Sequence, residues 1–537
     1  MNTSSLSGAY AVNPQPMAPV EAPSSTTSPR PPIQINAKSA GYVGPDRTVN
    51  FLYFSSHSRL TPDQDPLDTT QKKYINTDVL RHDANVKIYQ EITYLSKNGE
   101  PIGAAGNECV IETTDRADKV IIKKGPDDSL VATINNIPYQ LSLARSSDGT
   151  EIQPLRIKTK GGDDCVVIHP DVNNDIRIEL GEGNDYARAG SGNTRLYGGA
   201  GNDWLKLGSG VGIAFGDDGD DLLIAGSGSG ILKGNNGNDR MQSGEGSADR
   251  HIYMDGGDGH DFMISTSNDS PNPIVMHGGK GENLIVTQGP ATIYTGRDKN
   301  IVRSNSDDTV IYAKPSDEIH RTPGSTLIHT QYREAGKSGY VVEGSPEFIQ
   351  YVEDDMELLR MSLPGKKMLS TADNSAQRND SPVRITETAD DNGFYIFNNA
   401  AVRNHLATGK SLETLEPAAQ GYIAHNQRGA FATGAQLQYN PSFVPNDETA
   451  PVNVLFHEMA HAYNGATGTF LEGQTVIDEN PEGEPNDERQ AVGLPTDALS
   501  FDFDDHRATE PTTSNPPAFT ENALKEEMRR PLRTEYI

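Results

Sequence analysis

Alternating hydrophobic and polar positions dominate the first part of the chain and predict short β-strands. Between residues 50 and 180, runs of Val, Ile and Tyr are separated by Gly, Asn and Asp, as in TVNFLYF, NVKIYQEITYL, DKVIIKK, SLVATIN, DCVVIH and DIRIEL. Such runs are typical of half-buried strands that end in turns. We therefore expect a strand-rich region over 46–180, in which 127–141 and 158–169 are irregular coils of the structure that follows.

From Gly181 the pattern tightens into a repeat. The motifs GEGND, GAGND, DDGDD and NNGND place an aspartate every 18 residues, and turns such as GSGNT and GSGVG lie midway, so the underlying step is nine residues. Each step ends in a short hydrophobic strand, and glycine accepts the tight turns between strands at little steric cost. The repeat predicts a parallel β-roll (β-solenoid) over 181–303, followed by a connecting segment over 304–342.

Helical periodicity begins after residue 343. In SPEFIQYVEDDMELLRM, Ser345 is a candidate N-cap, Pro346 suits the first helical position, and one face carries Phe348, Val352, Met356 and Leu359. The runs PVRIT and FYIF around ADDNG predict a hairpin, and AQLQYN predicts a further strand. The expected architecture is therefore multidomain, with an all-β solenoid followed by an α+β domain over 343–537.

Composition and charge narrow the range of partners. The 537 residues carry a formal net charge of -29, which argues against nucleic acid as a partner because phosphate binding needs clustered Lys and Arg. No apolar run approaches the roughly 18 residues of a membrane span, and the N-terminus has no apolar core of a Sec signal. Residues 1–45, rich in Ser, Thr and Pro, predict a disordered region that is either a passive tail or an uncleaved export address.

The acidic turns of the repeat predict calcium binding. One full coil uses two steps, so all these turns fall on one edge, where carboxylates and carbonyls of neighbouring coils can surround Ca²⁺. The candidate ligands are Asp185, Asp203, Asp221 and Asp239. After them the step lengthens to reach Asp261 and then Asn283, which argues against calcium on these last coils. The alternative is that Gly and Asp serve only as turn formers.

The segment GGAGNDWLK, residues 198–206, fits the pattern G-G-x-G-x-D-x-U-x. It resembles the RTX nonapeptide repeats of calcium-binding secreted bacterial proteins. The resemblance extends over about residues 181–285 and departs from the pattern at alternate turns, which lack Asp.

The stretch VLFHEMAHAYNG predicts a zinc site on a helix over 452–464, bracketed by Pro451 and Gly465. His457 and His461 are one turn apart on the same face, so both can bind one zinc ion. Glu458 then lies beside the metal and suits a general base for the water that zinc activates. This pattern makes a zincin-like metallopeptidase the expected domain type.

A catalytic zinc needs a third protein ligand, and no third histidine follows at the required spacing. A carboxylate should complete the set, and the candidates are Glu472, Asp478, Glu479, Glu482, Glu484, Asp487 and Glu488. Glu488 is favoured because NDERQAVGL predicts a helix, capped by Asn486 or Asp487, and a rigid element holds a ligand better than a loop does.

Residues 343–537 resemble the zinc metallopeptidase domain of type III-secreted bacterial effectors, the NleD-like group. The shared stretches are GSPEFIQYVEDDMELLRM, LQYNPSF, LFHEMAHAYN, NDERQAVGL and PPAFTENALKEEMRRPLRTEY. The resemblance implies that His457 and His461 are zinc ligands, Glu458 the catalytic acid/base, and Glu488 the third ligand. Arg533 and Tyr536 stand in R-x-x-Y spacing, and a similar pair in clostridial neurotoxin light chains helps to stabilise the oxyanion; a surface C-terminus is the alternative.

The function that these patterns favour is a secreted effector that cleaves a host protein by zinc-activated water. The substrate would lie extended along a sheet edge next to AQLQYN, and delivery into the host cell would follow a non-Sec, type III route, with a secretion chaperone at the N-terminal region. Two alternatives stay open. One is a non-enzymatic calcium-binding adhesion module with a degenerate peptidase domain, and the other is a carbohydrate-active β-solenoid.

Overall fold

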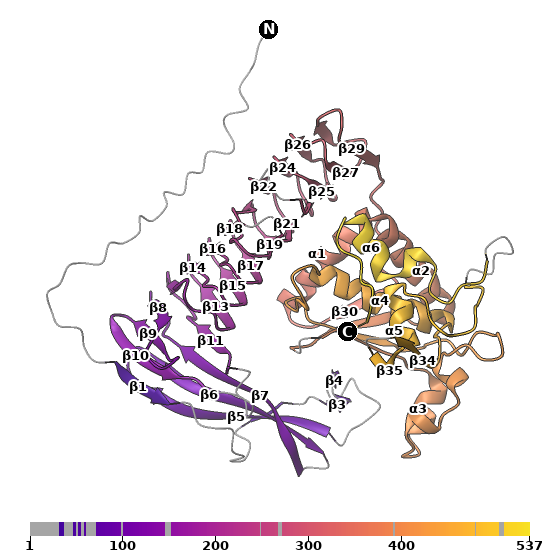
Figure 1. Ribbon diagram of the computed structural model, residues 1–537, viewed down its shortest axis with the longest axis horizontal. Coiled ribbons are helices and arrows are strands. Elements are labelled where there is room, and N and C mark those ends of the chain that lie inside the picture. Colours follow the sequence, from indigo (N-terminus) through magenta and orange to yellow (C-terminus); the bar gives the residue numbers. More distant parts are fainter. Residues whose placement is uncertain are drawn as a thin grey trace, which may run out of the picture.

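The computed structural model describes residues 32–36, 47–49, 52–54, 58–60, 71–97, 100–144, 152–246, 249–266, 271–389, 392–477, 480–503 and 510–536. The predicted disordered export region, 1–45, lies outside this set apart from 32–36. A long β-roll runs diagonally across Figure 1 and a mixed α/β region lies against its C-terminal half. Both predicted architectures, the parallel solenoid and the α+β domain, are confirmed.

Two sheets form the walls of the roll, and the first has the order β1, β10, β9, β8, β12, β14, β16, β18, β20, β22, β24, β26, β28 within the described residues. Its strands are β1 Ile33–Asn36, β8 Lys119–Lys124, β9 Leu130–Ile134, β10 Ile137–Ser142, β12 Cys165–Ile168, β14 Tyr186–Arg188, β16 Trp204–Lys206, β18 Leu222–Ile224, β20 Arg240–Gln242, β22 Phe262–Ser265, β24 Leu284–Thr287, β26 Ile301–Ser304 and β28 Glu318–His320.

The second sheet has the order β2, β5, β6, β7, β11, β13, β15, β17, β19, β21, β23, β25, β27, β29, again counting described strands. Its strands are β2 Arg47–Val49, β5 Gln71–His82, β6 Lys87–Lys97, β7 Glu100–Glu112, β11 Leu155–Lys158, β13 Ile176–Glu182, β15 Thr194–Ala200, β17 Gly212–Asp218, β19 Gly230–Asn236, β21 Ile252–Asp255, β23 Ile274–His277, β25 Ala291–Tyr294, β27 Thr309–Ala313 and β29 Thr326–His329. A separate small hairpin pairs β3 Leu52–Phe54 with β4 Ser58–Leu60.

The roll is held together by two rows of aliphatic side chains that repeat in register. One row is Val166, Ala187, Leu205, Leu223, Met241, Met263, Ile285 and Val302. The facing row is Ile178, Leu196, Ala214, Leu232, Met254, Met276, Ile293 and Ile311. All of these side chains are fully buried, so each short strand gains its stability from the coils on either side of it.

Two predicted boundaries of the roll are wrong. Residues 127–141 are not a coil, because β9 and β10 form an antiparallel hairpin at the N-terminal end of the roll. Residues 304–342 are not simply a connection, because β27, β28 and β29 add further parallel strands to both sheets. The hydrophobic rows extend beyond the last Gly-Asp motif, so the roll continues after the motif has ended. The prediction for 158–169 is confirmed, since β11 and β12 form a coil there.

The mixed α/β region contains helices around a small sheet. Its elements are β30 Tyr340–Glu343, α1 Pro346–Met361, α2 Leu363–Asn379, β31 Val383–Glu387, β32 Phe394–Ile396, α3 Ala400–Leu406, η2 Leu412–Thr414, η3 Pro417–Gln420, β33 Gln436–Tyr439, α4 Pro451–Thr467, β34 Gln474–Ile477, β35 Asn480–Pro485, α5 Asn486–Val492, η4 Pro517–Phe519 and α6 Glu521–Glu527. The predicted start of α1 is confirmed, because Ser345 Oγ accepts a hydrogen bond from the Phe348 amide at 3.1 Å.

The sheet of this region has the order β30, β31, β33, β32. The predicted hairpin of PVRIT with FYIF is therefore wrong. Strand β33 comes later in the sequence but lies between β31 and β32, parallel to the first and antiparallel to the second. The short loop between the two runs suggested direct pairing, whereas the fully buried strand β33 takes the central place in the sheet.

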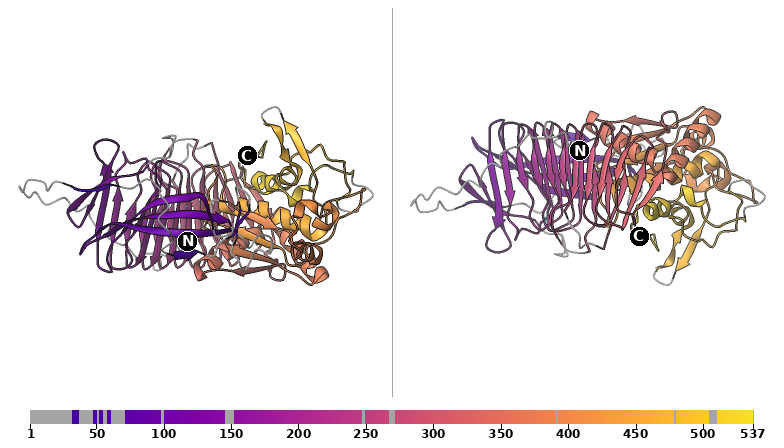
Figure 2. Two further views of the ribbon diagram at one scale, coloured as in Figure 1. Left: turned by 90° about the horizontal axis from the view of Figure 1, so that it is seen from below. Right: turned by 90° about the horizontal axis from the view of Figure 1, so that it is seen from above.

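The two regions share one hydrophobic core. The outer face of the second sheet buries Ile213, Phe215, Ile231, Tyr253, Val275, Tyr294 and Tyr312 against α1, β33, α4 and α6, a contact that Figure 2 shows from two further sides. At its centre Lys233 Nζ lies 2.6 Å from Asp355 Oδ1, both side chains being almost fully buried. The Tyr439 hydroxyl donates to the other oxygen of Asp355 at 2.7 Å. The roll is therefore a wall of the α/β region.

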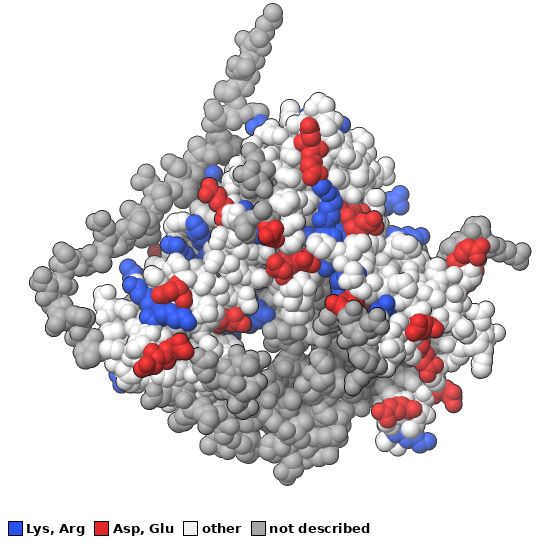
Figure 3. All heavy atoms as spheres, viewed as in Figure 1, with Lys and Arg blue, Asp and Glu red and all other residues white. Residues whose placement is uncertain are grey.

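The surface carries charges of both signs. Figure 3 shows Lys and Arg interspersed with Asp and Glu on this face. Among the helices that the structure describes, none is both long enough and apolar enough to cross a membrane.

Candidate metal centre

Helix α4 carries the candidate zinc ligands and ends later than predicted. It starts at Pro451 and closes with Gly468 in the left-handed conformation, φ 65°. Gly465, the predicted end, lies inside the helix, where a Cβ would overlap the hydroxyl of Tyr395. This glycine therefore permits close packing of α4 on β32, and Gly468 terminates the helix.

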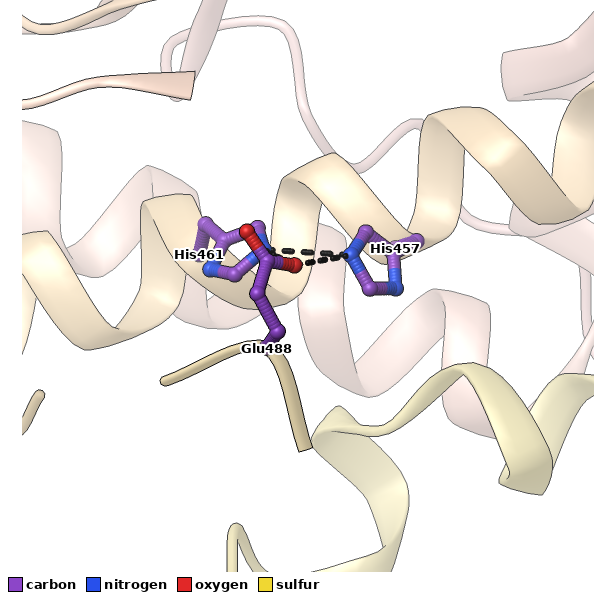
Figure 4. A group of neighbouring side chains, drawn as sticks. All are labelled: His457, His461 and Glu488. Atoms are coloured by element: carbon purple, nitrogen blue, oxygen red, sulfur yellow. Dashed lines mark hydrogen bonds and ion pairs between the residues drawn. The ribbon is translucent and has the colours of Figure 1, made fainter. Parts of the chain in front are cut away.

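Three side chains converge on one point beside α4, as Figure 4 shows. His457 Nε2 and His461 Nε2 are 3.1 Å apart, and each lies 3.1 Å from Glu488 Oε2. The three atoms thus form an equilateral triangle. Ligands at about 2.05 Å from a tetrahedral zinc ion are about 3.3 Å from one another, so this triangle fits the His-His-Glu set of a catalytic zinc with little adjustment.

The electrostatics of the cluster also favour a cation. Burial lowers the pKa of His457, but hydrogen bonds to Glu488 and Glu521 outweigh it and raise this pKa to about 10. Burial raises the pKa of Glu488, but the charge of His461 and hydrogen bonds to both histidines hold it well below its usual value. The carboxylates thus stabilise positive charge at the imidazole nitrogens, which is the requirement of a divalent metal.

The other carboxylates considered as third ligand do not reach the cluster where the structure describes them. Glu472 is exposed, Glu484 pairs with Arg489, and Asp487 accepts a hydrogen bond from the Tyr422 hydroxyl at 3.2 Å. Asp478 and Glu479 lie outside the described residues, as does the side chain of Glu482. The predicted cap of α5 is wrong, since Pro485 occupies the N-cap position without a side-chain hydrogen bond.

A buried amide network fixes α5, and with it Glu488, against α4. Asn515 Oδ1 accepts hydrogen bonds from Asn464 Nδ2 at 2.7 Å and from Gln490 Nε2 at 2.9 Å. Asn464 lies on α4 and Gln490 on α5. The distance between the two histidines and Glu488 is therefore set by fully buried hydrogen bonds, as a preorganised metal site requires.

Glu521 is a candidate positioning residue that the sequence did not reveal. Its Oε2 lies 3.1 Å from His457 Nδ1, the usual arrangement for a carboxylate that orients a metal-binding imidazole and fixes its tautomer. Glu521 is 64 residues from His457 in the chain, in the first turn of α6. No spacing rule connects the two positions, so only the fold could identify it.

The two tail residues occupy different places. Arg533 Nη1 donates to Glu521 Oε2 at 2.9 Å, so this side chain contacts the residue behind His457. The Tyr536 ring lies 6.2 Å from that of His457, and its pKa is raised by burial and by the carboxylates of Glu488 and Glu458. Tyr536 is therefore beside the cluster, while Arg533 lies one layer behind it.

Glu458 lies next to the edge of the small sheet. Burial raises the pKa of this carboxyl to about 7, with the charges of His457 and His461 opposing the shift. A Cβ on Gly393 would come within 2.8 Å of both Glu458 Cγ and Glu458 Oε1, so the backbone that leads into β32 passes directly over this side chain. An acid/base with a pKa near neutrality can both accept and donate a proton.

The four candidate calcium residues lie on one edge of the roll, as predicted, and are buried. In each, one carboxylate oxygen accepts a backbone N–H from the preceding coil, as in Asp185 N–H to Asp203 Oδ1 at 2.7 Å. The second oxygen has no hydrogen-bond partner in Asp185, Asp203, Asp221 or Asp239. Burial raises the pKa of Asp203 and Asp221 to about 8. A buried oxygen without a donor is the chemistry expected of a cation ligand.

Two family models match parts of the chain, and together they fit a secreted effector protease with calcium-binding repeats. Residues 336–536 match the model of the peptidase M91 family, described as effector protein. Residues 180–213 and 215–247 match the model of the RTX calcium-binding nonapeptide repeat. Both resemblances drawn from the sequence are confirmed. No curated protein and no solved structure matches the chain.

Proposed function

We propose that residues 336–536 are a zinc endopeptidase that cleaves a host protein. The observation that carries the proposal is the triangle of His457 Nε2, His461 Nε2 and Glu488 Oε2 with sides of 3.1 Å, beside which Glu458 lies on the same helix. A zinc ion held by these three residues would polarise both a water molecule and the carbonyl of the scissile peptide.

Glu458 would move the proton in this reaction. Its carboxylate takes a proton from the attacking water while the water oxygen forms a bond to the peptide carbon. It then gives that proton to the nitrogen as the C–N bond breaks, so the amine leaves neutral. Its pKa of about 7 suits both steps. Glu521 would position His457, and Tyr536 and Arg533 are the candidate oxyanion donors, of which Tyr536 is nearer to the cluster.

The edge of β32 is the favoured place for the substrate. The strand AQLQYN, which we expected to neighbour the substrate, is β33 and is paired on both sides. Strand β32 pairs only with β33 among the described strands, and the backbone before it contacts Glu458. An extended peptide that adds to this edge would bring its carbonyl groups past the metal centre.

The proposed function also includes a secretion route and calcium binding by the roll. We infer that the chain is secreted by a non-Sec, type III route into a host cell with a chaperone at its N-terminal region, and that the roll binds calcium. The effector and RTX matches support secretion and calcium binding.

The metal content of the purified full-length chain tests the proposal. After dialysis against metal-free buffer, elemental mass spectrometry should find about one zinc per wild-type chain and much less in Glu488→Ala. Glu472→Ala replaces an exposed carboxylate near the site and should keep its zinc. Absence of zinc from the wild type would overturn the peptidase proposal and favour the calcium-binding adhesion module.

Cleavage is then tested with Glu458→Gln as the inactive control. Host-cell lysate treated with wild-type protein should contain new protein N-termini that the variant does not generate, although the variant keeps its zinc. Equal sets of new N-termini from both proteins would contradict the role of Glu458.

A further inference from the structure

The turn edge of the roll carries one continuous ladder of side-chain to backbone hydrogen bonds. The side-chain oxygen of one coil accepts the backbone N–H of the residue at the same position in the preceding coil, at 2.6–3.0 Å. The acceptors are Asp164, Asp185, Asp203, Asp221, Asp239, Asp261, Asn283, Asn300 and Asp317. Their surroundings differ along the row.

Four consecutive coils combine two features. The second oxygens of Asp203, Asp221, Asp239 and Asp261 are buried and have no hydrogen-bond partner. Each of these residues also follows a glycine five positions earlier, where a Cβ would overlap the unpartnered oxygen, and these glycines are Gly198, Gly216, Gly234 and Gly256. The same Cβ on Gly216 would lie 2.7 Å from the carbonyl oxygen of Gly234 in the next coil. Oxygen atoms of two coils thus line each of these spaces.

At the C-terminal end of the row, side-chain nitrogen atoms take the place of the second carboxylate oxygen. Asn283 keeps the ladder through Oδ1, but its Nδ2 replaces the second oxygen and donates to the carbonyl of Gly278 at 2.5 Å. Asn300 Nδ2 donates to a different turn carbonyl, that of Asp298, two residues earlier, at 2.6 Å. In both coils a side-chain N–H therefore donates to a turn carbonyl, which the second carboxylate oxygen of an aspartate cannot do.

The last coil of the row contains the ammonium group of a lysine. Lys314 Nζ donates to the carbonyl of Gly296 at 2.5 Å and to Asp317 Oδ2 at 3.1 Å. Thr295 Oγ1 also donates to that oxygen, at 2.6 Å. Asp317 is thus an aspartate of the ladder whose second oxygen has internal donors, and a lysine nitrogen bridges the carboxylate and the turn carbonyl as a bound cation would.

Side chains close the N-terminal end. Leu180 is in register with Gly198, next to the paired Gly181 and Gly199, so the Asp185 coil carries a leucine where the four coils carry glycine. One coil earlier the same position is Thr159, whose hydroxyl donates to the carbonyl of Leu180 at 2.8 Å. In these coils a side chain occupies the position that the glycines leave open.

We propose that the cation sites of the roll are those of Asp203, Asp221, Asp239 and Asp261, and that the row excludes Asp185. The ligand is a hard divalent cation of the calcium class, since all groups offered are carboxylate and carbonyl oxygens. This inference rests on the calcium-binding part of the proposed function. Compared with the four residues predicted from the sequence, it adds Asp261, which lies beyond residues 180–213 and 215–247 that match the RTX repeat. It also removes Asp185.

Calcium bound per full-length chain tests the proposal, measured by equilibrium dialysis with radioactive calcium on matched Asp→Asn variants. Asn keeps the ladder bond, as Asn283 and Asn300 do, so the coils are retained; circular dichroism and zinc content verify this. Asp261→Asn should bind one calcium fewer than wild type, and Asp185→Asn should bind the same number. Asn283→Asp, which follows the open glycine Gly278, should bind one more.

The outcomes separate this inference from the proposal on which it rests. A loss of one calcium in Asp185→Asn with none in Asp261→Asn would overturn the assignment of the row. No calcium bound by the wild type at millimolar concentration would overturn calcium binding by the roll altogether, and the zinc measurement would be unaffected. A folded Asn283→Asp that gains no site would contradict the role given to side-chain nitrogens.

Discussion

Buried carboxylates in the two halves of this protein have opposite electrostatic surroundings. In the roll, Asp203 is surrounded by other aspartates, and burial together with their charges raises its pKa to about 8. In the α/β region, Glu488 faces two histidines, and their charges and hydrogen bonds outweigh burial and hold its pKa well below the usual value. Among the described residues, Asp203 lacks a cationic partner that would keep it ionised, whereas the His-His-Glu cluster contains groups that keep its carboxylate ionised.

A third buried carboxylate, that of Asp355, has a cationic partner inside the protein, but this partner belongs to the other region. Asp355 belongs to α1 and receives its cation from the roll, because Lys233 Nζ is 2.6 Å from its Oδ1. Turn residues of the aspartate-bearing coils contact the same helix, since Tyr351 donates to Asp217 Oδ1 at 2.5 Å and Asn235 Nδ2 donates to Asp354 Oδ2 at 3.0 Å. Roll and peptidase region are therefore expected to unfold together.

Calcium withdrawal should have the largest effect on stability. Each site contributes about 2.7 kcal/mol when free calcium is about 100 times its Kd, and several sites act on one cooperative core. We expect the fluorescence of Trp204, the single tryptophan, and the release of zinc to report one common transition that shifts to lower temperature without calcium. Zinc retained after the roll has melted would show that the two regions unfold independently.

Removing Lys233, the cation buried between the roll and the α/β region, should have the second-largest effect on stability. Lys233→Met leaves Asp355 buried without its ion-pair partner, and breaking such a pair costs about 3–5 kcal/mol of the free energy of unfolding. Urea unfolding at fixed calcium and zinc measures this. The control Lys299→Met changes an exposed lysine and should leave the midpoint within error; similar losses in both variants would contradict the assigned role of Lys233.

A smaller effect is expected from Glu521, which lies behind the His-His-Glu cluster. Glu521→Gln weakens the acceptor at His457 Nδ1, and such changes lower zinc affinity about 10–100-fold. Competition with a chromophoric chelator measures the affinity, and Glu526→Gln, on the exposed side of α6, serves as control. An unchanged affinity in Glu521→Gln would show that the 3.1 Å contact is only structural.

The smallest expected effect is the pH dependence of stability that comes from His251, a buried base near cationic side chains. His251 is 8% exposed; burial and the charge of Arg530, with a smaller part from Lys525, lower its pKa to about 4 against Asp447 and Asp249. The unfolded chain binds this proton more tightly, so its contribution is complete above pH 6.5 and is lost as the pH falls towards 4. The slope is at most about 1.4 kcal/mol per pH unit.

Urea unfolding at several pH values between these limits, with metals held constant, measures this slope. His251→Gln should unfold with a shallower pH dependence than wild type, whereas His425→Gln, at an exposed position, should not differ from it in slope. Identical slopes in all three proteins would assign the acid sensitivity to other groups.

The sequence by itself determined the class of both halves. A step of nine residues with Gly at the turns predicts stacked coils, because strands this short can bury their hydrophobic side chains only against neighbouring coils. HExxH on a helix fixes the mutual position of two ligands, because one helical turn is a local property. The periodic face of α1 and its Ser345 cap followed for the same reason: all of these depend on residues close in the chain.

Only the tertiary structure decided what depends on distant residues. Strand β33 lies between β31 and β32 although it follows both, and Glu521 meets His457 across 64 residues. The sequence argued against calcium from Asp261 onward because the step lengthens there, but the hydrogen bonds of Asn283 and Lys314 to turn carbonyl groups depend on the fold. Pairing order and hydrogen-bond satisfaction are properties of the whole fold, so no local pattern encodes them.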